Sequence, residues 1–329
     1  MTVKEHILKL FKAENELTVK EITDKLGVSK QMVHLVMKRL LDDNILEKFG
    51  RTPKTVYKLI SQKNKAAEDT PLPYISEKDN DFLAKNFLVV TETGNLLEKT
   101  EAFDHWCKQR KLPTEKTLKE FIETKKKYNS YYDKHGNVNG TAKLKSTKGY
   151  EKIYLDDLFY LDFYAIERFG KTRLGTILHY AKQGQNKFLM RLMMDEIRDR
   201  ITSFVKLHKA DAIGFVPPTI KREVQIMKFI QNNLQMALPV IEIKKTGGII
   251  PVPQKSLSKL DERIRNAENT FVVTERRAFK HVILIDDAVG SGSTLNQISG
   301  KIKNKKVAKK VTGLAIVGSF KGFDVITDV

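Results

Sequence analysis

Apolar residues recur at helical spacing in three consecutive stretches near the start of the chain. The stripes are Val3, Ile7, Leu8 and Phe11; Val19, Ile22 and Leu26; and Val33, Val36, Met37 and Leu40. Thr18 with Glu21 forms a capping box for the second helix, Gly27 supplies the left-handed residue that ends it, and Ser29 caps the third. The pattern therefore predicts three short helices, the third over 29–41.

Two short apolar stretches follow, ILEKF (45–49) and TVYKLI (55–60), separated by GRTPK (50–54). This arrangement predicts a β-hairpin with Arg51 and Lys54 at its tip. Three helices followed by a basic hairpin resemble a winged helix-turn-helix domain over residues 1–61. That resemblance implies that the third helix enters a DNA major groove and that the wing contacts phosphate. Winged helices also serve as protein-binding modules, so both alternatives stay open.

The outer face of the third helix carries the candidate DNA contacts. Gln31 and His34 are candidates for base edges, and Lys38 lies on the same face. Candidate phosphate contacts are Lys30, Arg51 and Lys54.

The pattern changes after residue 61. Residues 62–73 are polar and end in two prolines, as expected of a linker, and residues 74–160 form a mostly helical and loop region of no recognised family. Helices are predicted over 101–110 and 114–127. Tyrosines interleaved with lysines in 127–147 can stack nucleic-acid bases or pack in a core.

Strands and helices alternate in residues 161–329. Strands are expected at 212–216, 238–243, 271–273, 282–285 and 314–319, and helices over 173–203, with a break at Gly184, and up to about Gln235. Alternation of this kind predicts an α/β fold, a Rossmann-like parallel sheet with helices on both faces.

The stretch KHVILIDDAVGSGSTLNQ (280–297) carries the clearest chemical signal. A buried strand is followed by Asp286 and Asp287, a loop rich in glycine and serine, and a helix from Leu295. Glycines let the backbone approach an anion, and a helix N-terminus favours one, so the loop is a candidate phosphate cradle. The acidic pair suits the hydroxyls of an attached sugar. A strand, turn and helix without any ligand is the alternative, and a Walker A motif is excluded because GK[ST] is absent.

This stretch resembles the phosphoribosyl-pyrophosphate (PRPP) signature of type I phosphoribosyltransferases. Features over about 165–320 occur in an order similar to that of the ComF family of competence proteins. The residues that carry this likeness are Lys182 and Gly184; Val216, Pro217 and Pro218 with Lys221, Arg222 and Gln225; and Pro253, Gln254, Leu257, Ser258, Arg263, Asn266 and Phe271. Two features depart from the family: its cysteine zinc module is absent, and its pyrophosphate-side segment is shortened to REVQ.

The resemblance implies a binding mode for PRPP. The 5-phosphate would bind to Ala288, Gly290, Ser291, Gly292, Ser293 and Thr294, while Asp286 and Asp287 hold the ribose hydroxyls. The pyrophosphate would face Pro217, Pro218, Thr219, Lys221 and Arg222. A flexible lid would contribute Gln254, Lys255 and Arg263. Mg²⁺ would be bound only together with PRPP, because it prefers polyphosphate and oxygen ligands.

Composition narrows the expected partners. The formal net charge is +19 with a pI near 9.6, which favours a polyanionic ligand such as DNA. The single cysteine, Cys107, provides neither a disulfide framework nor a cysteine zinc site. No signal peptide or membrane-spanning run is recognised, so a cytoplasmic protein without a membrane partner is expected. Both domain types commonly dimerise, so a homodimer is one expected assembly.

Three functions fit these observations. The chain could be an enzyme that transfers phosphoribose from PRPP to an unidentified acceptor. It could be a DNA-binding regulator that senses PRPP or a nucleotide, similar in its pair of domains to the purine repressor. It could also handle single-stranded DNA, as the ComF resemblance implies.

Overall fold

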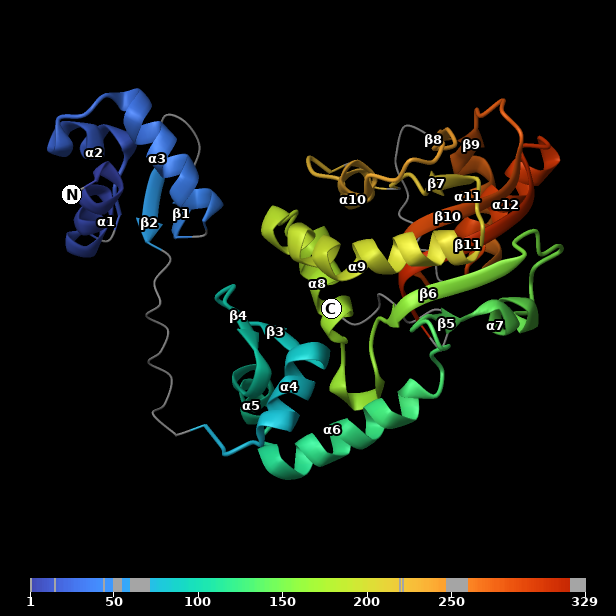
Figure 1. Cartoon of the computed structure of the whole chain (residues 1–329), viewed down its shortest axis with the longest axis horizontal. Coiled ribbons are helices and arrows are strands. Elements are labelled where there is room, and N and C mark those ends of the chain that lie inside the picture. The colour runs from blue at the N-terminus through green and yellow to red at the C-terminus, as the bar shows by residue number, and fades with distance from the viewer. Residues whose placement is uncertain are drawn as a thin grey trace. The chain divides into compact units, whose positions relative to one another are not determined.

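The structure, a computed structural model, describes residues 2–14, 16–43, 45–49, 55–59, 72–218, 220, 222–246 and 260–319. The chain divides into two compact units, a first unit of Met1–Pro71 and a second unit of Leu72–Val329 (Figure 1). The first unit has one hydrophobic core of its own, and the second has two core clusters on opposite faces of a sheet.

The first unit contains three helices and a hairpin. They are α1 (Val3–Ala13), α2 (Val19–Leu26), α3 (Lys30–Asp42), β1 (Leu46–Phe49) and β2 (Val56–Leu59), with β1 antiparallel to β2. Their positions confirm the predicted helices and hairpin.

The predicted caps of this unit are present. The Thr18 side chain accepts a hydrogen bond from the Glu21 amide, and the Glu21 carboxylate accepts one from the Thr18 amide. Gly27 ends α2 with a left-handed φ of 63°, and the Ser29 side chain caps α3. The caps turn α2 and α3 so that their apolar stripes share one core.

The second unit is built around a five-stranded sheet of order β5-β6-β11-β10-β7. The strands are β5 (Val138–Asn139), β6 (Asp157–Phe163), β7 (Ala212–Phe215), β10 (Phe279–Val289) and β11 (Ala308–Gly318). Neighbours from β6 to β7 are parallel, and β5 pairs antiparallel with β6. The α/β architecture with a mostly parallel sheet matches the expected class at this coarse level.

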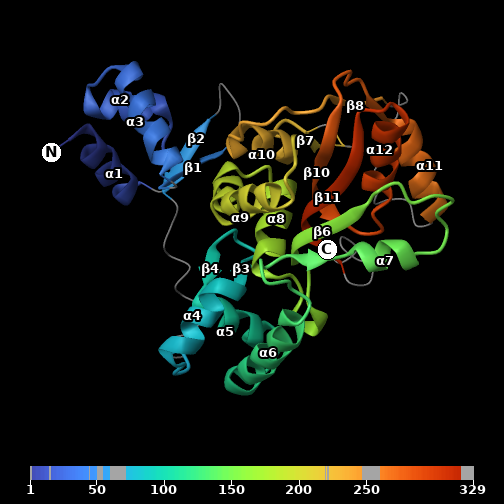
Figure 2. The ribbon, with the colours of Figure 1, turned by 45° about the vertical axis from the view of Figure 1, so that its right-hand side comes forward.

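Helices cover both faces of the sheet (Figure 2). One face packs against α8 (Arg173–Gln183), α9 (Lys187–Leu207) and α10 (Ile226–Leu234). The other packs against α11 (Leu260–Thr270) and α12 (Ser293–Asn304). Alternate β10 side chains therefore enter two different cores, as expected of a strand buried on both sides.

The strand expected at 238–243 is wrong. Residues 239–241 instead make a single parallel bridge between Ile213 and Val240 at the β7 edge. Pro239 has no N–H to extend a ladder there. The strand in this region is β8 (Ile243–Lys245), which pairs with β9 (Phe271–Val273) in a separate two-stranded sheet.

The segment from 72 to 160 belongs to the second unit. It contains α4 (Glu77–Asn86), β3 (Leu88–Val90), β4 (Leu96–Glu98), α5 (Lys99–Gln109), α6 (Thr114–Asn129) and the short α7 (Thr141–Ser146). Helices α5 and α6 confirm the two predicted there. Most of its aromatic side chains join the core on the α12 face of the sheet. The boundary expected between residues 160 and 161 falls within β6.

The tyrosines of this segment take part in packing. Tyr128 lies edge-on to Phe163 with ring centroids 4.9 Å apart, and Tyr132 lies 5.8 Å from the same ring. The Tyr132 hydroxyl also donates to Asp162. These contacts favour the packing alternative over base stacking for Tyr128 and Tyr132.

Candidate functional site

The exposed face of α3 is the candidate DNA-binding surface. Lys30, Gln31, His34 and Lys38 are all exposed, whereas the buried stripe of α3 faces the core. The twelve residues from Lys30 to Leu41 include no acidic side chain. The predicted wing contacts Arg51 and Lys54 lie outside the described residues. The individual contacts to bases and phosphates stay predictions.

A second candidate site lies where β7 and β10 end. The chain leaving β7 leads to α10 on one face of the sheet, and the chain leaving β10 leads to α12 on the other face. The Val216 amide donates to the Ile285 carbonyl at 2.9 Å, so the end of β7 lies beside Ile285 of β10, just before the acidic pair. Open α/β sheets bind ligands at such a switch point, outside the carboxyl ends of the strands.

Asp286 and Asp287 lie at this edge, but within the strand and not after it. The expectation that the strand ends at Ile285 is wrong, because β10 pairs with β11 as far as Val289 opposite Gly318. Successive side chains of a strand point to opposite faces, so the two carboxylates diverge. The predicted helix begins at Ser293, two residues before the expected Leu295.

Lys182, the penultimate residue of α8, reaches the Asp287 carboxylate. Its Nζ lies 2.5 Å from Oδ2 of Asp287, whose side chain is only 11% exposed. Lys182 is one of the residues that carry the resemblance to the ComF family, but the sequence predicted no contact for its side chain. Nothing in residues 182 and 287 alone indicates this pair, since it depends on how α8 packs on the sheet.

The acidic pair has an unusual charge state. Burial, with the neighbouring Asp287 carboxylate second, raises the pKa of Asp286 to about 7, while Lys182 acts in the opposite direction. Oδ1 of Asp286 also accepts a hydrogen bond from the Asp287 amide at 2.8 Å. Near neutral pH the pair therefore carries less than two full negative charges. A bound cation or a hydroxyl donor would stabilise the ionised form of Asp286.

The loop after β10 is a tight turn at the start of α12. Gly292 has a left-handed φ of 85°, which favours glycine, and it is the N-cap of α12. Ser291 and Ser293 are buried and joined by a hydrogen bond of 3.2 Å between their hydroxyls, whereas Gly290 and Thr294 are partly exposed. Ala288 is also partly exposed. The predicted phosphate cradle thus presents Gly290 and Thr294 more openly than Gly292 and its two serine hydroxyls.

A small hollow adjoins one side of the turn. It is lined by Leu144, Tyr160 and Ser291 among others, and its volume of about 10 Å³ corresponds to a single water molecule. A sugar phosphate is far larger.

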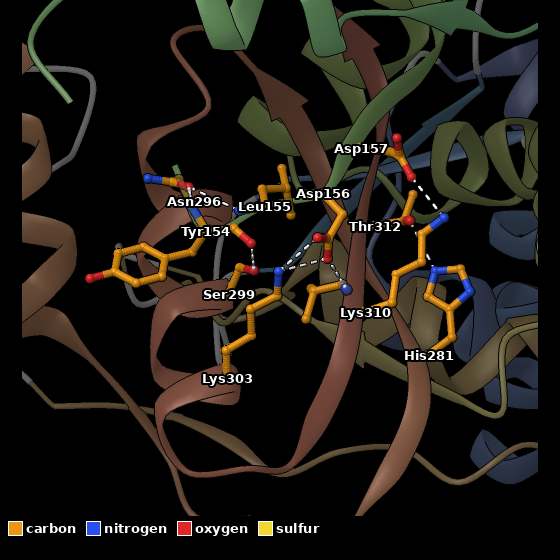
Figure 3. A network of polar contacts seen from close by, with 11 residues as sticks. Tyr154, Leu155, Asp156, Asp157, His281, Asn296, Ser299, Lys303, Lys310 and Thr312 are labelled. Carbon is orange, nitrogen blue, oxygen red and sulfur yellow. Dashed lines mark hydrogen bonds and ion pairs between the residues drawn. The ribbon is translucent and has the colours of Figure 1, made fainter. Parts of the chain in front are cut away.

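The segment before β6 fastens α12 to the sheet. Oδ1 of Asn296 accepts from the amides of Tyr154 and Leu155 at 2.7 and 3.1 Å, and Ser299 donates to the Tyr154 carbonyl (Figure 3). Lys303, one helical turn further, pairs with Asp156. Asn296 and Ser299 are fully buried. This network fixes α12, and with it the turn at its N-terminus.

Arg222 is the described cation of the predicted pyrophosphate loop. Its guanidinium donates to the Lys182 carbonyl and, at 2.9 Å, to Oε1 of Gln183. The end of α8 is therefore bound to β10 through the Lys182 ammonium and to the β7–α10 loop through the Lys182 carbonyl. In the same loop Pro217 is partly exposed and Pro218 exposed.

Several other predicted residues cannot be placed. Thr219 and Lys221 of the loop, and Gln254 and Lys255 of the lid, lie outside the described residues. Arg263 belongs to α11 by its backbone, and its side chain lies outside the described part. Where the chain is described, no group of three or more His, Cys, Asp or Glu side chains could hold a metal ion. None of its described helices is long and apolar enough to cross a membrane.

Comparison with known proteins supports the assignment of the first unit. The family model for winged helix-turn-helix DNA-binding domains matches residues 3–47. No curated protein matches the chain. The N-terminal unit is thus a winged helix-turn-helix domain of the DNA-binding kind.

Proposed function

We propose that this protein is a DNA-binding regulator whose second unit binds PRPP. The observation that carries the proposal is the position of an acidic pair and a glycine turn at the β7–β10 switch point. A regulator requires two sites on one chain, and the winged helix-turn-helix domain supplies the first.

Different described residues would bind the ribose, the 5-phosphate and the pyrophosphate of PRPP. The Asp286 and Asp287 carboxylates would accept hydrogen bonds from the ribose hydroxyls. The backbone amides from Gly290 to Thr294, at the α12 N-terminus, would donate to the 5-phosphate. Lys182, which reaches Asp287, and Arg222, which is bound to the end of α8, would face the pyrophosphate.

The acidic pair also suits a divalent cation. Because the two carboxylates point to opposite faces of the sheet, each would supply oxygen ligands to a cation separately, and burial together with the Asp287 carboxylate raises the pKa of Asp286. Asp286 and Asp287 would hold the ribose hydroxyls, and a bound Mg²⁺ would supply neutralisation of the pyrophosphate charge. These side chains would orient the ribose.

Transfer of phosphoribose is a second candidate function. The Lys182 and Arg222 contacts favour it, because cations beside the pyrophosphate would stabilise the charge that develops on that leaving group. In such a reaction the bond from ribose C1 to pyrophosphate oxygen breaks and a bond to a nucleophilic acceptor forms. Release of pyrophosphate across a panel of bases would separate an enzyme from a sensor.

Isothermal titration of the full chain with PRPP and Mg²⁺ tests the ligand site. The double replacement Asp286→Asn and Asp287→Asn is expected to abolish binding, since both ribose acceptors lose their charge. Asp157→Asn is a matched control, because Asp157 begins β6 at the opposite end of the sheet and pairs with Lys310. Unchanged affinity in the double variant would refute the site.

Titration with PRPP in the presence and absence of duplex DNA tests the coupling. A regulator is expected to show a reciprocal change in affinity, typically about 5- to 150-fold. Independent binding of the two ligands would exclude regulation by PRPP while leaving each site intact. A gel shift of the full chain over a salt series tests DNA binding itself, and no shift at low salt would contradict it.

A further inference from the structure

The exposed face of α3 carries one large apolar side chain near its centre. Leu35 is 51% exposed, although the core side chains of α3 are buried. Helical geometry places Leu35 on one stripe with Gln31, four residues before it, and Lys38, three residues after it. Met32 is 45% exposed but lies toward the margin of this face, beside the buried stripe.

The surroundings of Leu35 are cationic. Lys30, Lys38 and Arg39 are exposed on the same helix, and no acidic residue occurs from Lys30 to Leu41. A surface that buried a protein partner through Leu35 would leave these like charges to be matched, whereas the phosphates that border a DNA groove match them directly. Charge complementarity therefore selects duplex DNA as the occupant of this face.

We infer that Leu35 recognises the 5-methyl group of a thymine in the major groove. The major-groove edge of thymine offers an acceptor oxygen and a methyl group, and an apolar side chain is the natural partner of the methyl. Side chains of a helix lean toward its N-terminus, so Leu35 covers a spot next to Gln31. Glutamine pairs with adenine edges, so Gln31 and Leu35 together would read A·T base pairs. The inference rests on the DNA-binding part of the proposed function and is independent of PRPP.

The test removes one methyl group from the DNA. Preferred duplexes are first selected from a randomised pool by the full chain, and each thymine of the recovered site is then replaced by deoxyuridine. Uracil keeps the pairing and the acceptor oxygen of thymine and lacks only the 5-methyl. At one or more positions this replacement is expected to weaken binding about fourfold, the value for one buried methyl group.

The variants assign that loss to a side chain. Leu35→Ala is expected to bind thymine and uracil duplexes equally at those positions. Met32→Ala removes a side chain of similar size at the margin of the face and is expected to keep the fourfold difference. Both residues are exposed, so neither variant is expected to lower the melting temperature appreciably, which circular dichroism checks.

Three results would overturn the inference. The wild-type chain would bind thymine and uracil duplexes equally at every position, or Leu35→Ala would retain the difference. A change in oligomeric mass of Leu35→Ala with the difference intact would assign Leu35 to a protein interface. If no duplex binds even at low salt, the DNA-binding role fails as well, and that result is distinct from equal binding of the two duplexes.

Discussion

The two candidate sites of this protein are assembled in opposite ways. The α3 face is one segment of thirteen residues, in which helical spacing alone decides what is exposed. The β7–β10 edge combines side chains from α8, β10 and the loop before α10, which are far apart in the sequence. A site on one helix tolerates changes elsewhere, whereas a composite site depends on how several elements pack.

Lys182→Met should give the largest change in stability, and only in the second unit. It removes the counter-ion of Asp287, whose carboxylate is nearly buried, and broken buried pairs cost about 3 kcal/mol. Because Lys182 is itself 34% exposed, about 2 kcal/mol is expected. Urea unfolding of the full chain would measure it.

Lys206→Met is the control for this change, since Lys206 is exposed on α9. An equal loss in both variants would show that Lys182 contributes apolar packing and no specific charge pairing. A loss in the unfolding transition of the first unit would contradict the division into two units.

Asp286→Asn should stabilise the second unit at alkaline pH. The folded pKa of Asp286 is raised to about 7, well above the ordinary value of an aspartate, so its protonated form stabilises the fold and this contribution is lost as pH rises through 7. Asparagine imitates the protonated form. The gain at pH 8 should exceed the gain at pH 5 by somewhat under 2 kcal/mol, allowing for solvent screening.

Thermal unfolding of both proteins at the two pH values measures this difference. Asp287→Asn, next in the strand, should instead destabilise the second unit, because it removes the carboxylate that pairs with Lys182. A pH-independent effect of Asp286→Asn would exclude the proposed charge state.

Thr18→Ala should have the smallest effect, confined to the first unit. It removes the side-chain acceptor of the Glu21 amide at the start of α2 and should cost about 1 kcal/mol. Thr18→Ser keeps a hydroxyl acceptor and should restore most of that loss. If calorimetry shows the same loss for serine as for alanine, the methyl group of Thr18 matters more than its cap.

The first unit could be predicted closely because its information is local. Thr18, Gly27 and Ser29 determine where α2 and α3 begin and end, and the family model over 3–47 agrees. Leu35 is a different case. Its exposure could be predicted from the same periodicity, since it lies opposite Val33 and Met37 on the helix. An exposed leucine alone does not indicate a function, and the basic residues around it are what suggest DNA.

The second unit could be predicted only in part. Apolar runs located β7, β9 and the centre of β10, because a buried strand requires them. The extension of β10 through Asp286 and Asp287 depends on β11 as a pairing partner, and such a partner leaves no mark in the sequence of β10. The Lys182–Asp287 contact is equally a product of tertiary packing.

The position of β6 bears on any attempt to isolate the PRPP-binding part. Starting an expressed fragment at residue 161 would delete most of β6, which pairs with β11 from Asp157 to Phe163. The edge of β11 that β6 normally covers would then be exposed and could pair with a strand of another molecule. The fragment would therefore aggregate or form non-native dimers. Cutting the chain at Leu72 keeps this strand, and would be the sounder choice for binding studies.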